Sequence, residues 1–250
     1  MMRTSNPALN NATFTAIART ALTTESMTIQ GTVNKSLVLL VLLCLSAIWT
    51  WRAYLIGHDP RAVIPWLLIG GIGGLIVALI TVFKKAWSPV TAPVYALLEG
   101  LVLGGISSIF ETLYPGVVIQ AVGLTFGTLF GLLLAYKSGL IRATEKFKLG
   151  VVAATGGIAL FYIITMILGL FNIHISYIYE NGLIGIGFSL FVVVIAALNL
   201  VLDFDFIEQG ATQGVPRYME WYGAFGLMVT LIWLYLEILR LLSKMRSRRD

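Results

Sequence analysis

The sequence predicts an all-α integral membrane protein with seven transmembrane helices. Of its 250 residues, 58% are hydrophobic and 12% are charged, and the mean hydropathy is +0.89. A soluble globular domain typically has about 25% charged residues. Seven apolar runs each approach the roughly 20 residues that an α-helix needs to cross a bilayer. They lie at about residues 36–56, 62–83, 89–111, 116–136, 148–171, 182–206 and 220–243.

Residues 1–35, which precede the first run, form a polar tail without an apolar stretch. A secretory signal would need such a stretch, so we expect the tail to stay attached and to be cytoplasmic. Phe14 and Ile17 could belong to a weak apolar helix face, and a partly disordered tail is an equal alternative. The expected domains are this tail, a transmembrane domain over 36–243 and a basic C-terminal tail over 244–250.

Proline and glycine mark the predicted helices in order. Pro65 and Pro89 fall at the starts of the second and third runs, where a missing backbone donor is tolerated. Short connections predict that neighbouring helices are antiparallel and packed. In the fourth run, Gly123, Gly127 and Gly131 form a ridge of small residues at every fourth position, which predicts close helix packing.

The basic residues indicate how the chain is oriented. The net charge of +5 comes from residues between apolar runs and at the termini, which favours anionic lipid headgroups and excludes nucleic acid as the expected partner. The first loop has Arg61, with Arg52 near it, whereas the tail and the even-numbered loops are rich in Lys and Arg, so we expect these to be cytoplasmic. They carry Arg3, Arg19, Lys35, Lys84, Lys85, Lys137, Arg142, Lys146, Lys148 and Arg217.

The C-terminus disagrees with this orientation. Seven crossings place Lys244 and Arg246 on the outer side, although basic residues prefer the cytoplasm. We favour seven crossings; the alternative is that the last run enters the membrane and returns on the same side.

Two acids lie near the cytoplasmic end of the sixth run. Asp203 and Asp205 are two residues apart, so on a helix they point about 200° away from each other and cannot face one pocket. A carboxylate at the edge of hydrocarbon costs roughly 2.5–3.5 kcal/mol, which makes such residues functional candidates. The alternative is that both acids simply form the polar end of the helix, continuing through Glu208.

Two further acids lie inside apolar runs. Glu237 is deep in the last run, and Arg240 follows three residues later, so the two can form a local ion pair. Glu99 lies in the middle of the third run without a basic neighbour one turn away in either direction. It therefore needs a partner on another helix or a proton.

Other kinds of site are poorly represented. The single cysteine, Cys44, lies in an apolar run and excludes an internal disulfide and a cysteine metal site. Two isolated histidines, His58 and His174, are a weak basis for a zinc site. Neither a nucleotide-binding P-loop nor a serine-nucleophile elbow occurs. We therefore expect no catalytic residues, no cofactor and no enzymatic activity.

The last two apolar runs resemble those of a known family. The sixth ends in Leu202-Asp203-Phe204-Asp205-Phe206-Ile207, and the seventh reads Leu234-Tyr235-Leu236-Glu237. With seven predicted spans, they resemble the Bax inhibitor-1 family, and more closely its bacterial YccA-like branch. The family has Asp in place of Glu237. The resemblance covers about residues 35–243, and the tail beginning Asn6-Pro7-Ala8 looks specific to the branch.

The resemblance implies a bundle around the last helix and a pH-sensitive leak for cations, chiefly Ca²⁺, in the inner (plasma) membrane. Asp203 and Glu237 would share a proton, since like charges disfavour double ionisation. Loss of that proton would break the pair and leave oxygen ligands for a transient Ca²⁺. Asp205 would attract cations at the cytoplasmic side, and Glu99 would be a third acid of the pathway.

One departure from the family affects this pair. The segment between Asp203 and Glu237 is longer than usual, so a straight hairpin offsets the two acids by about 20 Å. They meet only if residues 211–224 lie along the interface or the helices are strongly staggered, and Glu99 is then a rival partner for Glu237.

Two other functions remain as alternatives. The family resemblance also allows a membrane interaction protein that modulates a membrane-bound protease, with the 35-residue tail as the recognition element. An intramembrane aspartyl hydrolase using Asp203 is the weakest alternative, because neither acid has a Gly-x-Gly-Asp setting.

Overall fold

The computed structural model describes residues 26–57, 60–171 and 182–248. Within these ranges the chain forms seven long helices, each long and apolar enough to span a membrane, and no strand beyond one isolated bridge. The predicted fold class is therefore confirmed. The helices are α2 (Ile29–Gly57), α3 (Ile64–Phe83), α4 (Ser88–Leu113), α5 (Val117–Lys137), α6 (Glu145–Leu170), α8 (Leu183–Gln213) and α9 (Met219–Ser247), with short 3-10 turns η2 (Pro60–Ala62) and η3 (Lys85–Trp87).

The last two helices are longer than their apolar runs. Helix α8 continues past Asp205 to Gln213 and ends at Gly214, whose φ of 64° terminates the helix in the left-handed conformation. Asp203 and Asp205 are therefore inside the helix, two turns or more before its last residue. Helix α9 is continuous from Met219 to Ser247, which excludes a re-entrant last run and an interfacial segment over 211–224.

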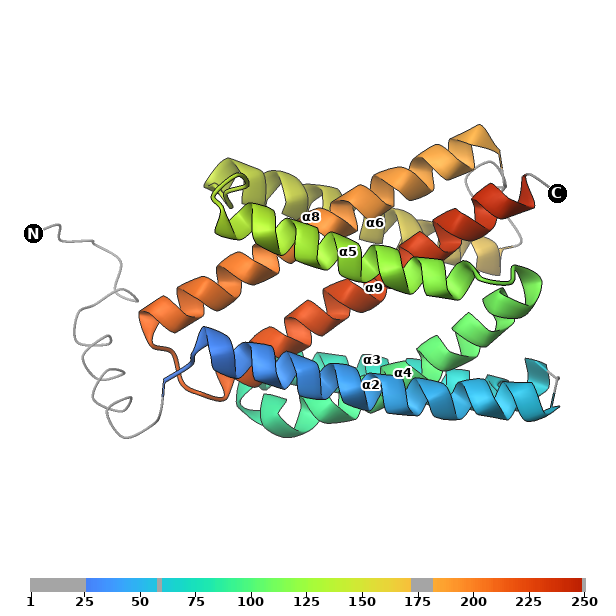
Figure 1. Cartoon of the computed structure of the whole chain (residues 1–250), viewed down its shortest axis with the longest axis horizontal. Coiled ribbons are helices and arrows are strands. Elements are labelled where there is room, and N and C mark those ends of the chain that lie inside the picture. Colours follow the sequence, from blue (N-terminus) through green and yellow to red (C-terminus); the bar gives the residue numbers. More distant parts are fainter. Residues whose placement is uncertain (1–25, 58–59, 172–181, 249–250) are drawn as a thin grey trace, which may run out of the picture.

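Helix α9 is the centre of the bundle. Half of its most apolar window (50%) is buried, against 11% for α6. It packs against α2, α4, α5 and α8, and Figure 1 shows it running obliquely between α2 and α5. Its buried side chains Met228, Leu234 and Leu239 form one core with Leu39 of α2 and Leu200 of α8. The expectation of a bundle around the last helix is confirmed.

Glycine packing differs from the prediction. A Cβ at Gly104 of α4 would lie 2.2 Å from the carbonyl oxygen of Ala47 of α2, so glycine is required for this close approach. On α5, however, a Cβ at Gly123, Gly127 or Gly131 would meet no atom within 4 Å in the described chain. The prediction that this ridge packs against another helix is wrong, because α5 contacts α8 and α9 through other faces.

The outside of the bundle is apolar, as expected for a protein solvated by lipid. Ile72, Leu75, Leu134 and Met166 are each more than half exposed. The start of α2 and the end of α9 lie at opposite ends of the bundle (Figure 1). We call the end at which α2 and α9 begin the tail end.

Candidate functional site

Asp203 lies where α8 packs against α9. Its Oδ1 atom lies 3.9 Å from the position that a Cβ at Gly226 would occupy, and the side chain forms a hydrogen bond with Thr230. Its other carboxyl oxygen, Oδ2, is buried and is the one buried side-chain polar atom of the described chain without a hydrogen-bond partner. Buried polar atoms are nearly always hydrogen-bonded, so the surroundings of Asp203 are incomplete.

Glu237 lies on α9 in a complete set of polar contacts. Arg240 Nη1 donates to both Glu237 oxygens, at 2.9 and 3.1 Å, and the Tyr162 hydroxyl of α6 donates to Oε1 at 3.0 Å. The guanidinium of Arg240 also lies 5.6 Å from the centre of the Tyr162 ring. The Glu237 side chain is only 3% exposed, whereas that of Arg240 is 41% exposed. The local ion pair considered from the sequence is therefore present.

The structure does not bring Asp203 and Glu237 together. Asp203 contacts Thr230, and Glu237 follows Thr230 by two turns on the same face of α9, about 10 Å along the helix. The expected hydrogen-bonded pair is therefore not formed in this conformation. The physical reason is the long hairpin: α8 continues to Gln213 and α9 begins at Met219, so no long interfacial segment brings the two acids to the same height.

Asp205 points away from Asp203, as the helical period requires. Its Oδ2 atom pairs with Lys148 Nζ of α6 at 2.8 Å and accepts a hydrogen bond from Gln209 at 2.6 Å. Lys148 also lies 3.4 Å from Glu145 in the first turn of α6. Asp205 thus joins α8 to the tail end of α6.

Glu99 is also separate from the other acids. It lies on α4 and faces α3, where a Cβ at Gly74 would come within 2.8 Å of its Oε1 atom. Tyr95 lies one turn earlier on the same helix. The polar partners of Glu237 are Tyr162 and Arg240, so the structure does not pair Glu99 with Glu237.

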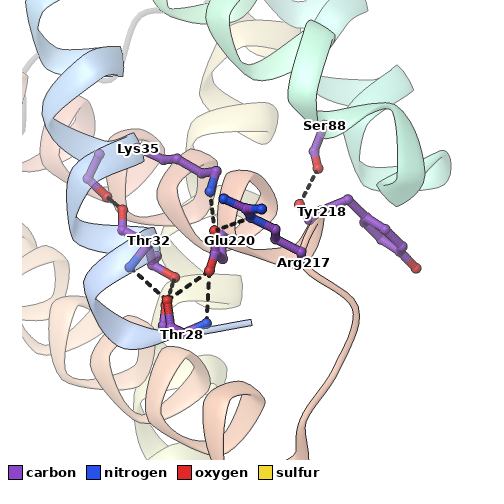
Figure 2. A network of polar contacts seen from close by, with 9 residues as sticks. Thr28, Thr32, Lys35, Ser88, Arg217, Tyr218 and Glu220 are labelled. Carbon is purple, nitrogen blue, oxygen red and sulfur yellow. Dashed lines mark hydrogen bonds and ion pairs between the residues drawn. The ribbon is translucent and has the colours of Figure 1, made fainter. Parts of the chain in front are cut away.

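Sequence reasoning missed Glu220, in the first turn of α9. This residue is 2% exposed. Its Oε1 atom accepts hydrogen bonds from the backbone N–H and the hydroxyl of Thr28, both at 2.9 Å. Its Oε2 atom pairs with Lys35 of α2 and lies 3.9 Å from Arg217 Nε. Figure 2 shows the carboxyl group between Thr28 and Lys35.

The Glu220 network fastens the start of the described chain to the turn between α8 and α9. The Met27 N–H donates to the Val215 carbonyl at 2.8 Å, and Ser26 forms a bridge with Pro216. Gly31 leaves room for the carboxyl group, because a Cβ there would lie 2.1 Å from Glu220 Oε1 and displace it. An acid in the first turn of a helix is favourable, but this pattern does not predict which residue pairs with it. Lys35 is 185 residues away in the sequence.

A second missed residue is Lys244, near the opposite end of α9. It is 6% exposed, and its Nζ atom donates to the Gly185 carbonyl at 3.2 Å and to the Ser189 hydroxyl at 3.0 Å. The sequence had assigned it to a basic tail outside the membrane. Helix α9 extends through it, so the lysine joins α9 to the start of α8.

No group of three or more His, Cys, Asp or Glu side chains able to hold a metal ion occurs among the residues that the structure describes. His58 and His174 lie outside those residues, as do Phe14, Ile17, Arg3 and Arg19 of the tail. The predicted transient Ca²⁺ ligands, Asp203 and Glu237, do not converge in this conformation.

Comparison with known proteins gives a family match over almost the whole chain. A model of the family described as Bax inhibitor 1 like matches residues 6–247. This range includes every helix that carries one of the buried acids. None of the curated proteins compared with the chain matches it.

Proposed function

The chain belongs to the Bax inhibitor 1 like family, and on that premise we propose that it is a proton-sensitive leak for cations, with Ca²⁺ as the permeant ion. We further propose that it belongs to the bacterial YccA-like branch and lies in the plasma membrane with a cytoplasmic tail end. The basic residues Lys84, Lys85, Lys137 and Arg142 at that end support the orientation. In this proposal the protein is no enzyme and uses no cofactor.

The observation that carries the proposal is the unpartnered Oδ2 atom of Asp203. A carboxylate oxygen buried without a hydrogen-bond donor is costly. The atom therefore needs either a proton or a cation, and an exchange of one for the other is the elementary step of a proton-sensitive cation leak.

The surroundings of Asp203 fit that exchange. Thr230 is its hydrogen-bond partner on α9, and Gly226 contributes no side chain beside it. The nearest acid along α8, Asp205, is occupied by Lys148. When the proton leaves, the negative charge faces the central helix without a fixed counter-ion, and a carboxylate oxygen is a ligand that Ca²⁺ accepts.

Glu237 is the second acid of the proposed pathway. Arg240 neutralises it in this conformation. The arginine side chain is 41% exposed and the Glu237 side chain 3% exposed, so Arg240 can leave only when a cation takes its place. In the proposal, a cation that moves along α9 from Asp203 meets Glu237 next and competes with Arg240. Asp205 and Glu99 are assigned only to cation attraction near the tail end and along α4.

The test is Ca²⁺ flux into liposomes that contain the purified full-length protein, measured from mildly acidic to mildly alkaline pH. We expect flux that rises with pH in the wild type and loses that pH dependence in Asp203→Asn. Glu237→Gln should reduce the flux. Glu111→Gln is the matched control, because Glu111 accepts hydrogen bonds from Gly116 and Val118 at the opposite end. Absence of flux above empty liposomes would overturn the proposal.

The alternative, a modulator of a membrane-bound protease, has one observation in its favour. Ser26 and Met27, within the predicted 35-residue tail, are fastened to the α8–α9 turn, so a partner that pulls on residues before them would act on α8 and α9. A tail truncation that abolishes binding of a protease, while Asp203→Asn leaves it intact, would favour this alternative over the leak.

A further inference from the structure

A groove runs between α2 and α5 on the outside of the bundle, with α8 and α9 as its floor. Its larger part has a volume of about 950 Å³ and is lined by α2 from Ile29 to Leu40 and by α5 from Phe126 to Lys137. A smaller hollow of about 300 Å³ continues it toward the opposite end, and Leu40, Phe126, Met228 and Leu231 line both.

The groove has the depth of one lipid leaflet. Ile29 and Leu40 are eleven residues apart on α2, which corresponds to about 16 Å, half of the roughly 30 Å hydrocarbon core. The same spacing separates Phe126 from Lys137 on α5. Between these limits the walls are mainly apolar side chains, among them Val33, Leu37, Leu129 and Leu133. An acyl chain fits such walls, whereas an extended peptide would leave its backbone polar groups without partners.

The tail end of the groove contains two cations without a carboxylate partner among the described residues. Lys137 and Arg142 line it, and no carboxylate of the described chain forms an ion pair with either. Of the two acids at this rim, Asp205 is paired with Lys148, and Glu208 accepts a hydrogen bond from the Tyr136 hydroxyl. Lys137 and Arg142 are thus lining cations that no ion pair of the described chain neutralises, so both are available to an anionic ligand.

We propose that the groove binds one anionic phospholipid of the leaflet at the tail end. Its phosphodiester lies between Lys137 and Arg142 and pairs with both side chains. One acyl chain lies between α2 and α5 and contacts Met228 and Leu231 of α9. The binding does not depend on the leak, so either proposal can fail without the other.

The experiment is native mass spectrometry of the detergent-solubilised full-length protein with phosphatidylglycerol or phosphatidylcholine of identical chains. We expect one phosphatidylglycerol to be retained in preference, and the Lys137→Ala, Arg142→Ala double variant to reduce its bound fraction about tenfold. The matched control is Lys84→Ala with Lys146→Ala, which removes two exposed cations at the same end that do not line the groove. Equal losses in both double variants would overturn the proposal.

A second pair of variants tests the acyl chain. Leu133→Trp fills the groove, whereas Leu134→Trp adds the same ring to the neighbouring residue, which is 68% exposed and does not line the groove. We expect only Leu133→Trp to displace the phospholipid, with both variants unfolding at wild-type temperature. Retention of lipid by Leu133→Trp would overturn the proposal. The proposal would also be overturned if the full-length protein bound no phospholipid and a variant without residues 1–25 did, because those residues would then be the occupant of the groove.

Discussion

Glu220 and Asp203 both place carboxyl oxygens in buried positions beside the tail-end half of α9, but the surroundings of these oxygens differ. Both oxygens of Glu220 have partners: Thr28 donates twice to Oε1, and Lys35 and Arg217 face Oε2. Asp203 has a hydrogen bond with Thr230, and its Oδ2 atom has no partner in the described part of the chain. The difference teaches that burial alone does not indicate the role of an acid, whereas the partners of its oxygens do.

The two sites have different consequences for the chain. The partners of Glu220 compensate its charge, and its contacts join α2 to α9. We therefore expect Glu220 to contribute to the stability of the folded protein. Asp203 joins α8 to α9 weakly and leaves one oxygen available to a proton or a cation. Replacement of each acid by its amide should therefore separate stability from transport.

The largest stability effect is expected from Glu220→Gln. The amide leaves the Lys35 ammonium, which is 16% exposed, without its carboxylate. Removal of one partner from a buried ion pair typically costs about 3 kcal/mol or more. The measurement is unfolding of the purified protein in detergent, by heat or by a denaturant. Glu220→Met combined with Lys35→Met is the control, because replacing both partners with apolar side chains restores much of the loss. Equal loss in the single and double variants would contradict the assignment.

The fold was predictable because it follows from length and hydropathy. Seven runs of sufficient length with few charges predict seven crossings. That the last helix, α9, is the central one is visible in the structure, where more of its side chains are buried than in the other helices. The Gly123, Gly127 and Gly131 ridge failed as a prediction because small residues permit an approach without requiring one. The same pattern at Gly100 and Gly104 of α4 does pack against α2.

The site was predictable only in part. Apolar neighbours identify Asp203 and Glu237 as unusual, and the spacing of Arg240 correctly indicates a local ion pair. Glu220 and Lys244 were missed because each obtains its partners from a distant part of the sequence. An acid beside Trp221 in a helix start looks like an ordinary first-turn residue until α2 is placed against it.

The second effect is that of Gly31→Ala, which perturbs the Glu220 carboxyl without changing any charge. The new Cβ would overlap Glu220 Oε1 at 2.1 Å, so the carboxyl must leave Thr28, at about 2 kcal/mol. Gly127→Ala is the matched control, because its Cβ meets nothing within 4 Å in the described chain, and alanine is then slightly stabilising. Unfolding temperatures of the two variants check this; similar values would show that the Glu220 contact is dispensable.

A smaller effect is expected from Glu237→Gln. The amide still accepts the Tyr162 hydroxyl, and the Arg240 side chain is 41% exposed and also lies beside the Tyr162 ring, so the loss is about 1 kcal/mol. Arg240→Gln should be the more destabilising of the two, because it leaves a carboxylate that is 3% exposed without its counter-ion. Denaturant unfolding of both variants measures this asymmetry, and the reverse order would mean that Glu237 is neutral in the folded protein.

The smallest stability effect is expected from Asp203→Asn. The side chain keeps its size and its hydrogen bond with Thr230, and it exchanges one unpartnered polar atom for another, so the change should stay below about 1 kcal/mol. Its effect on transport should be the largest, because an amide can neither release a proton nor carry the charge that a cation needs. Flux and unfolding measured on one preparation test both parts. A destabilisation as large as that of Glu220→Gln would mean that Asp203 is a structural acid whose second partner forms only in the membrane, and the contrast between the two sites would then disappear.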